Sequence, residues 1–216
     1  MGCRRTDVPI RRGSLPDDMF LFVNPGSGGN KGQVFLKAPK PFIVDVDGGK
    51  KVQLHVFSML EGDSGNKPGF RKLKEVIAKR AATGLPVVRA VVGGGDGTVM
   101  WADSEGQKHG IDTPKQVAWG IVPLGTGNDF SRVAGWGGNN PEGVDANDFE
   151  LLKDLVRQWD RAKVRHHDVW EVSVNLDESE GKLFKIGKTQ VEEDLNVTSK
   201  TFHMVNYFSI GWNLKG

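Results

Sequence analysis

Apolar residues along this 216-residue chain gather in short runs, which polar and glycine-containing loops separate. Three of the runs have the length of buried strands: MFLFVN (19–24), LPVVRAVV (85–92) and VAWGIVPL (117–124). The segment KVQLHVFSM (51–59) alternates apolar and polar residues, which also indicates a strand. Residues 70–82 and 147–162 instead repeat apolar side chains at helical spacing, which predicts amphipathic helices. Strands that alternate with helices indicate an α/β fold, here a three-layer sandwich around a mostly parallel sheet.

The chain beyond residue 162 has a different pattern. Residues 163–176 and 201–211 are rich in β-forming side chains, and Gly181 lies near an expected hairpin between them. We therefore expect a β-rich segment that leads into a second, truncated β-rich domain. The expected organisation is a basic arm, an α/β catalytic domain and the truncated β-rich domain, over residues 1–18, 19–162 and 163–216.

Composition narrows the class of protein. Hydrophobic residues make up 38% and charged residues 26%, which suits a folded core. The formal net charge is only +2, so we expect no nucleic-acid partner. The single cysteine excludes an internal disulfide and suits a reducing, cytoplasmic compartment. No apolar run reaches the roughly 20 residues that a membrane-spanning helix needs, and the start does not resemble a secretion signal.

The first residues, MGCRRT, fit a lipidation pattern. Gly2 and Thr6 match the N-myristoylation signal, and Cys3 is a candidate for palmitoylation. Nearby arginines would add attraction to anionic lipid, so we expect peripheral association with a membrane surface. A chance match on a solvated tail is the alternative interpretation.

Glycine-rich loops follow three of the predicted strands, at 26–32, 93–97 and 125–127. In a parallel sheet such loops meet at one edge, beyond the carboxyl ends of the strands, where ligands bind. Glycine lets backbone N–H groups turn toward an anion and approach it closely. The sequence therefore predicts a nucleotide polyphosphate site. The first loop fits neither G-x-G-x-x-G nor G-x-x-x-x-G-K-[ST], so an ordinary Rossmann site or P-loop is not supported.

Polar side chains in these loops are the candidates for chemistry. Asp96 lies between a buried strand and a helix start, and a carboxylate beside phosphates requires a cation or a transferred proton. A solvated turn aspartate is the alternative, because Asp-Gly is a common turn dipeptide. Thr98 could cap the following helix or contact a phosphate, and Asn128 and Asp129 could cap the next turn or contact the ligand.

Several motifs, in the same order along the chain, resemble the catalytic domain of eukaryotic-type diacylglycerol kinases. They are NPGSGG (24–29), GGDGT (94–98), PLGTGNDFSR (123–132) with WGG (136–138), and NYFSIG (206–211). GGDGT also occurs in NAD kinases, phosphofructokinases and sphingosine kinases, whereas the third motif and NYFSIG are more selective. The resemblance implies transfer of the γ-phosphoryl group of ATP, with Mg²⁺, to the free hydroxyl of diacylglycerol, giving phosphatidic acid.

The resemblance also implies roles for individual residues. Asp96 would bind Mg²⁺ or accept the proton of the lipid hydroxyl. The nucleotide would be held by residues of all three loops: Asn24, Ser27, Gly28, Gly29, Gly94, Gly95, Gly97, Thr98, Gly125, Thr126, Asn128 and Asp129. Phosphoryl transfer suits such a site, because the protein mainly positions the reactants and neutralises charge.

Two features depart from the family pattern. Trp212 and Asn213 follow NYFSIG where an acidic residue is usual, which argues against a second metal site. The chain ends at Gly216, where family members enter the second domain, so we expect an N-terminal catalytic-domain fragment with weak or no activity by itself. A sphingoid-base or NAD kinase is the nearest alternative. An ATP-binding regulatory or pseudo-kinase module without turnover is another.

Overall fold

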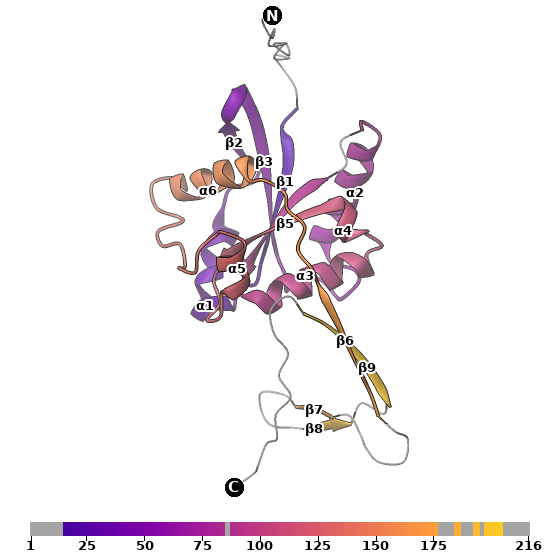
Figure 1. The fold of residues 1–216 in the computed structure, drawn as a ribbon. Helices are drawn as coiled ribbons and strands as arrows, with labels where there is room; N and C mark the ends of the chain where they lie inside the picture. Colours follow the sequence, from indigo (N-terminus) through magenta and orange to yellow (C-terminus); the bar gives the residue numbers. More distant parts are fainter. Residues whose placement is uncertain (1–14, 85–86, 177–183, 187–191, 195–196, 205–216) are drawn as a thin grey trace, which may run out of the picture. The chain divides into compact units, whose positions relative to one another are not determined.

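The computed structural model describes residues 15–84, 87–176, 184–186, 192–194 and 197–204 (Figure 1). The candidate lipidation sites Gly2 and Cys3, the hairpin glycine Gly181 and the NYFSIG motif lie outside the described residues. The chain divides into two compact units, one that ends at Arg165 and one that begins at His166.

A five-stranded sheet forms the centre of the first unit, with strand order β2-β3-β1-β4-β5 (Figure 1). The strands are β1 (Asp17–Val23), β2 (Phe42–Val46), β3 (Lys50–Ser58), β4 (Val88–Gly94) and β5 (Val117–Pro123). β1 pairs in parallel with β3 and β4, and β4 pairs in parallel with β5. β2 is antiparallel to β3 at the edge. The prediction of an α/β fold with a mostly parallel sheet is therefore confirmed.

β2 is a strand that the apolar pattern did not predict. Phe42, Val44 and Val46 are buried, whereas Ile43 and Asp45 are exposed. This alternation is typical of an antiparallel strand that has one covered face. The run is only five residues long and contains an aspartate, so by itself it resembles a loop.

Side chains of β1 alternate between two hydrophobic cores, one on each face of the sheet. Met19, Leu21 and Val23 belong to the first core, and Phe20 and Phe22 belong to the second. None of the five is more than 2% exposed. Successive side chains of a strand point to opposite faces, so a strand that is covered on both sides is apolar throughout. This explains why residues 19–23 form an uninterrupted apolar run.

Helices cover both faces of this sheet and complete the three layers (Figure 1). The first core packs against α6 (Glu150–Arg161) and the 3₁₀ helix η1 (Lys31–Lys37). The second core packs against α2 (Pro68–Ala81) and α3 (Asp96–Lys108). The predicted three-layer sandwich is therefore confirmed.

The amphipathic helix α6 starts later than predicted. Leu152, Val156 and Trp159 are at most 3% exposed, as the helical spacing indicated. Residues 147–149, however, have positive φ angles of 47°, 57° and 60°, which a right-handed helix excludes. The predicted start at residue 147 is therefore wrong, and the helix begins at Glu150.

The other helices of the first unit that the structure describes are single turns. They are α1 (Ser27–Asn30), η2 (Asp47–Gly49), α4 (Thr113–Gln116) and α5 (Asp129–Val133). In the glycine-rich segment at 26–32, predicted as a loop, Gly28, Gly29 and Asn30 of α1 have left-handed backbone, and η1 begins directly after them at Lys31.

The second unit contains short antiparallel pairs of strands. β6 (Trp170–Asn175) pairs with β9 (Ser199–Met204), and β7 (Phe184–Ile186) pairs with β8 (Glu192–Asp194). The predicted β-rich character near the C-terminus is therefore confirmed. Among all residues that the structure describes, no helix combines the length and the apolar character needed to cross a membrane.

Candidate functional site

The carboxyl ends of β1, β4 and β5 lie side by side and carry the three glycine-rich loops. The backbone N–H of Asn24 donates to the carbonyl of Gly93 at 2.9 Å, and that of Leu124 donates to the carbonyl of Gly94 at 3.0 Å. The Asn24 side chain also accepts the N–H of Gly26 at 3.2 Å. Main-chain hydrogen bonds thus join the second loop to the other two. α1, α3 and α5, which begin within or directly after the loops, lie at this end of the sheet (Figure 1).

The first loop turns through successive residues with left-handed backbone. The φ angle is 61° at Gly28, 68° at Gly29 and 72° at Asn30. Space also requires a glycine at position 28, because a Cβ there would lie 2.2 Å from the carbonyl oxygen of Leu124. Ser27 begins the turn and is partly buried. The first loop therefore lies directly against the start of the third.

The second loop places Asp96 in the first turn of α3. Gly95 occupies the N-cap position with extended backbone, φ −93° and ψ −176°. Thr98 is inside the helix, so the prediction that it could cap α3 is wrong. Its side chain packs against Gly94, where a Cβ would lie 2.4 Å from Oγ1. Gly97 is exposed and has open space around it.

The third loop lies against the second. A Cβ at Gly125 would lie 2.6 Å from the Cα of Gly95, so only glycine permits this approach. Asn128, which is buried, fixes the loop from within. Its Oδ1 accepts the N–H of Gly125 at 3.1 Å, and its Nδ2 donates to the carbonyls of Gly125 and Gly138 at 2.9 and 3.0 Å. Asn128 occupies the N-cap position of α5, but its side chain makes no capping hydrogen bond. Thr126 is exposed at the tip of the loop.

The backbone N–H groups at the start of α5 donate to a side chain of a distant loop, that of Asp96. The Asp96 carboxylate accepts the backbone N–H groups of Asp129 and Phe130, each at 3.2 Å. Asp96 is partly buried, whereas Asp129 is exposed. The N-terminus of α3 favours negative charge at the Asp96 position. Sequence reasoning missed this contact, because no local signal links a carboxylate in one loop to the helix start after another.

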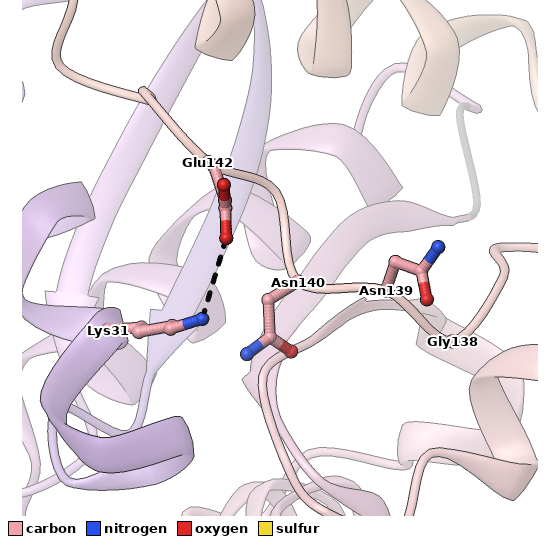
Figure 2. Close-up of a pocket in the computed structure, with 5 residues that line it drawn as sticks. All are labelled: Lys31, Gly138, Asn139, Asn140 and Glu142. Carbon is pink, nitrogen blue, oxygen red and sulfur yellow. Dashed lines mark ion pairs between the residues drawn. The ribbon is translucent and has the colours of Figure 1, made fainter.

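An open hollow of about 610 Å³ adjoins the first loop and the segment that follows α5. It is lined by Lys31, Gly138, Asn139, Asn140 and Glu142 (Figure 2). A Cβ at Gly28 would lie 3.3 Å from Nδ2 of Asn140, so this lining residue of the hollow lies directly beside the first loop. Sequence reasoning also missed this feature. The available signal was Lys31, a basic residue directly after the glycine-rich turn.

Comparison with known proteins agrees with the motifs. The sequence profile described as the diacylglycerol kinase catalytic domain matches residues 18–164. The chain belongs to this family. The resemblance that the motifs indicated is therefore confirmed.

Named relatives carry the same description. Diacylglycerol kinase eta of Mesocricetus auratus is 32% identical over 154 residues, which are 71% of this chain and 11% of that protein. Diacylglycerol kinase delta of Mus musculus is 31% identical over 159 residues, which are 74% of this chain and 11% of that protein. The chain thus spans about a tenth of the length of these curated relatives. A crystal structure of a diacylglycerol kinase from Bacillus anthracis str. Sterne matches at 24% identity and a TM-score of 0.34, over 73% of this chain and 45% of that chain.

Membership of a kinase family raises the question of a metal ion. In the part of the chain that the structure describes, no three or more His, Cys, Asp and Glu side chains gather closely enough to hold one. Magnesium often binds through one or two carboxylates together with substrate phosphates. A single carboxylate such as that of Asp96 is compatible with a Mg²⁺ ion that arrives with a polyphosphate. The site does not fit a metal centre closed by protein side chains.

Proposed function

We propose that this chain is the catalytic part of an ATP-dependent lipid kinase, which phosphorylates diacylglycerol to phosphatidic acid. The observation that carries the proposal is the convergence of glycine-rich loops from three neighbouring parallel strands, with one carboxylate, Asp96, at their centre. Because the chain spans only about a tenth of its relatives, the activity, substrate and partners of the whole protein belong to this proposal.

In this proposal, residues 19–162 form the nucleotide-binding domain, and the backbone of the loops holds the phosphates. N–H groups near Gly28 and Gly29, and others in the second and third loops, turn toward the anion because glycine permits it, whereas the Gly125 N–H donates to Asn128. The contributing residues are Ser27, Gly28, Gly29, Gly94, Gly95, Gly97, Thr98, Gly125, Thr126 and Asp129. Asn24 and Asn128 act differently, because their side chains shape the loops through internal hydrogen bonds.

Asp96 is assigned to the metal and phosphate site. Two backbone N–H groups hold its carboxylate in one orientation, which suits a residue that must position a charged ligand. A bound Mg²⁺ ion would neutralise the charge on the phosphates. The lipid hydroxyl forms a bond to the γ-phosphorus, the bond from that phosphorus to the bridging oxygen breaks, and the proton of the hydroxyl is released. Acceptance of that proton by Asp96 is the other assignment that the motif permits.

The acceptor lipid resides in a membrane, so the enzyme must work at a membrane surface. We assign this contact to the basic arm at residues 1–18, with acyl chains on Gly2 and Cys3. Intact mass spectrometry after expression in a eukaryotic cell tests the assignment. The mass should exceed that of the bare chain by a myristoyl group, and by a palmitoyl group where Cys3 is modified. An unmodified chain contradicts it.

A lipid-phosphorylation assay tests the proposed function. The purified 216-residue chain is incubated with labelled ATP, Mg²⁺ and one acceptor at a time: diacylglycerol in mixed micelles, sphingosine or NAD. Labelled phosphatidic acid is the expected product, at a low rate for this part of the protein by itself, and Asp96→Asn should lower that rate roughly 100-fold. Asp154→Asn makes the same chemical change on the exposed face of α6 and should leave the rate unchanged.

Other outcomes of this assay distinguish the alternatives. Phosphorylation of sphingosine or NAD alone would identify a different kinase of the same superfamily. A thermal shift with Mg·ATP, without any labelled product, would indicate a nucleotide-binding module that does not turn over. Either result contradicts the proposed reaction.

A further inference from the structure

We propose that the hollow beside the first loop binds a phosphate group. Lys31 supplies the positive charge, and the Glu142 carboxylate competes with the phosphate for Lys31. The proposal deepens the proposed function, because it adds ligand-binding residues next to the nucleotide loops, and it rests on that function for the identity of the natural ligand. The binding itself can be measured without any turnover.

The walls of the hollow are fixed to the nucleotide loops. Lys31 directly follows the left-handed turn that ends at Asn30, so its backbone is set by the first loop. On the opposite side, the Gly138 carbonyl accepts the Asn128 amide at 3.0 Å, and the neighbouring Gly137 carbonyl accepts the Ser131 hydroxyl at 2.6 Å. The hollow, at about 610 Å³, is open to solvent and is lined by polar side chains and one glycine.

The side chains that converge on the hollow can donate several hydrogen bonds. Lys31, Asn140 and Glu142 point toward one another, whereas Asn139 points away (Figure 2). The lysine ammonium carries three N–H donors and the Asn140 amide carries two. Within the described part of the chain, no hydrogen bond occupies the Asn140 amide. A phosphate group, with several acceptor oxygens and more than one negative charge, suits these donors. A metal ion suits them poorly, because an ammonium group lies beside the carboxylate.

The contact between Lys31 and Glu142 is a weak one. Nζ of Lys31 and Oε1 of Glu142 are 3.8 Å apart, a distance longer than a hydrogen bond (Figure 2). The Glu142 side chain is 84% exposed and that of Lys31 is 49% exposed, so water screens the attraction. Exposed ion pairs of this kind contribute little to stability. A phosphate that forms direct hydrogen bonds can therefore replace Glu142 as the partner of Lys31.

The same helix provides a matched control. Lys37, also on η1, donates a hydrogen bond to Asp145 at 2.8 Å. Neither residue lines the hollow. Lys37→Met and Asp145→Asn therefore change the net charge of the protein as Lys31→Met and Glu142→Gln do, without changing the proposed site.

Calorimetric titration of the full chain with sodium tripolyphosphate, and with ATP, tests the proposal. Lys31→Met should weaken binding about tenfold, whereas Lys31→Arg should retain most of it. Glu142→Gln should strengthen binding about threefold, because it removes the competing carboxylate. In the double variant Lys31→Met with Glu142→Gln, affinity should equal that of Lys31→Met alone, since the glutamate acts through the lysine. The control variants at Lys37 and Asp145 should bind as the wild type does.

Vesicles distinguish the source of the phosphate. Co-sedimentation is measured with phosphatidylcholine vesicles that contain or lack phosphatidic acid. If Lys31→Met weakens the binding of tripolyphosphate and ATP, the hollow belongs to the nucleotide. If Lys31→Met weakens only the binding to vesicles that contain phosphatidic acid, the hollow belongs to the lipid phosphate. If Lys31→Met and Lys31→Gln both bind every probe as tightly as the wild type, the proposal is overturned. The proposal is also overturned if Glu142→Gln changes the phosphate affinity of the Lys31→Met variant as much as it changes that of the wild type.

The two proposals fail in different ways. A chain that forms no labelled lipid but binds tripolyphosphate through Lys31 contradicts the proposed function and supports this inference. A chain that phosphorylates diacylglycerol with unchanged nucleotide and phosphatidic acid binding in Lys31→Met supports the function and contradicts this inference.

Discussion

The carboxylate of Asp96 accepts the backbone N–H of Phe130 at 3.2 Å, although 34 residues separate the two along the chain. The contact joins the start of α3 to the start of α5. It adds a side-chain link to the main-chain bond between Leu124 and Gly94, which already holds the second and third loops together. The start of α5 is therefore held by Asp96 as well as by its own loop.

Replacement of Asp96 should destabilise the protein in addition to affecting chemistry. Asp96→Ala removes the acceptor of two N–H groups at the start of α5, so we expect the free energy of unfolding to fall by roughly 1 kcal/mol. Asp96→Asn keeps one carbonyl oxygen and should lose less. Urea denaturation measures both. Asp129→Ala leaves the backbone N–H donor in place and serves as the control; a loss as large as that of Asp96→Ala would contradict this account.

Two neighbouring glycines should respond differently to alanine. Gly28 and Gly29 both have left-handed backbone, which costs a non-glycine residue roughly 1–2 kcal/mol. Only at Gly28 would the added Cβ also meet a backbone atom, the Leu124 carbonyl oxygen at 2.2 Å. Gly28→Ala should therefore reduce the free energy of unfolding by roughly 1–3 kcal/mol more than Gly29→Ala. Thermal denaturation of the two variants tests the difference, and equal melting temperatures would show that the loops separate without strain.

The buried carboxylate of Glu105 should contribute strongly to stability. Glu105 on α3 is 0% exposed and accepts hydrogen bonds from the Gly65 N–H and from the Ser64 hydroxyl, the latter at 3.2 Å. Glu105→Ala leaves the Gly65 N–H without its acceptor, so we expect a loss of roughly 2–4 kcal/mol. Glu75→Ala, which removes an exposed partner of Lys72, should cost less than about 0.5 kcal/mol in the same urea titration. Similar losses in both variants would mean that the buried carboxylate is not needed to hold this loop.

The Asp145 carboxyl should titrate below its ordinary pKa. The hydrogen bond from Lys37 holds the pKa of the Asp145 carboxyl below its ordinary value. Because the pKa is lower in the folded chain than in the unfolded chain, the pair stabilises the fold above about pH 4 and loses this effect as the pH falls through the folded pKa. NMR titration of the carboxyl carbon gives the midpoint, which should rise in Lys37→Met. An unchanged midpoint would mean that the hydrogen bond does not form in solution.

The sequence predicted the central parts of the fold better than its edges. β1, β4 and β5 were identifiable because strands covered on two faces form continuous apolar runs, and β3 was identifiable from the alternation of its apolar residues. β2 escaped notice, because an edge strand with one covered face contains exposed positions such as Ile43 and Asp45. The start of α6 was placed too early, since backbone angles at Asn147 and its two successors are not encoded by hydrophobic spacing.

In the site, the sequence indicated where the backbone goes but not what the side chains contact. Glycine-rich segments after parallel strands were enough to predict that the three loops share one edge of the sheet. The partners of Asp96 and Asn128 depend on the exact approach of loops that are distant in sequence. The pairing of Lys31 with Glu142 depends on the path of the chain after α5. Their roles in binding and catalysis stay predictions.

Main-chain bonds, contacts between glycines and the side chains of Asp96 and Asn128 hold the strand ends together. Thr126 and Gly127 are exposed at the tip of the third loop, and neither takes part in the bonds that join the strand ends. A combinatorial library at these two positions could therefore be screened for new donor nucleotides while the scaffold beneath them remains intact.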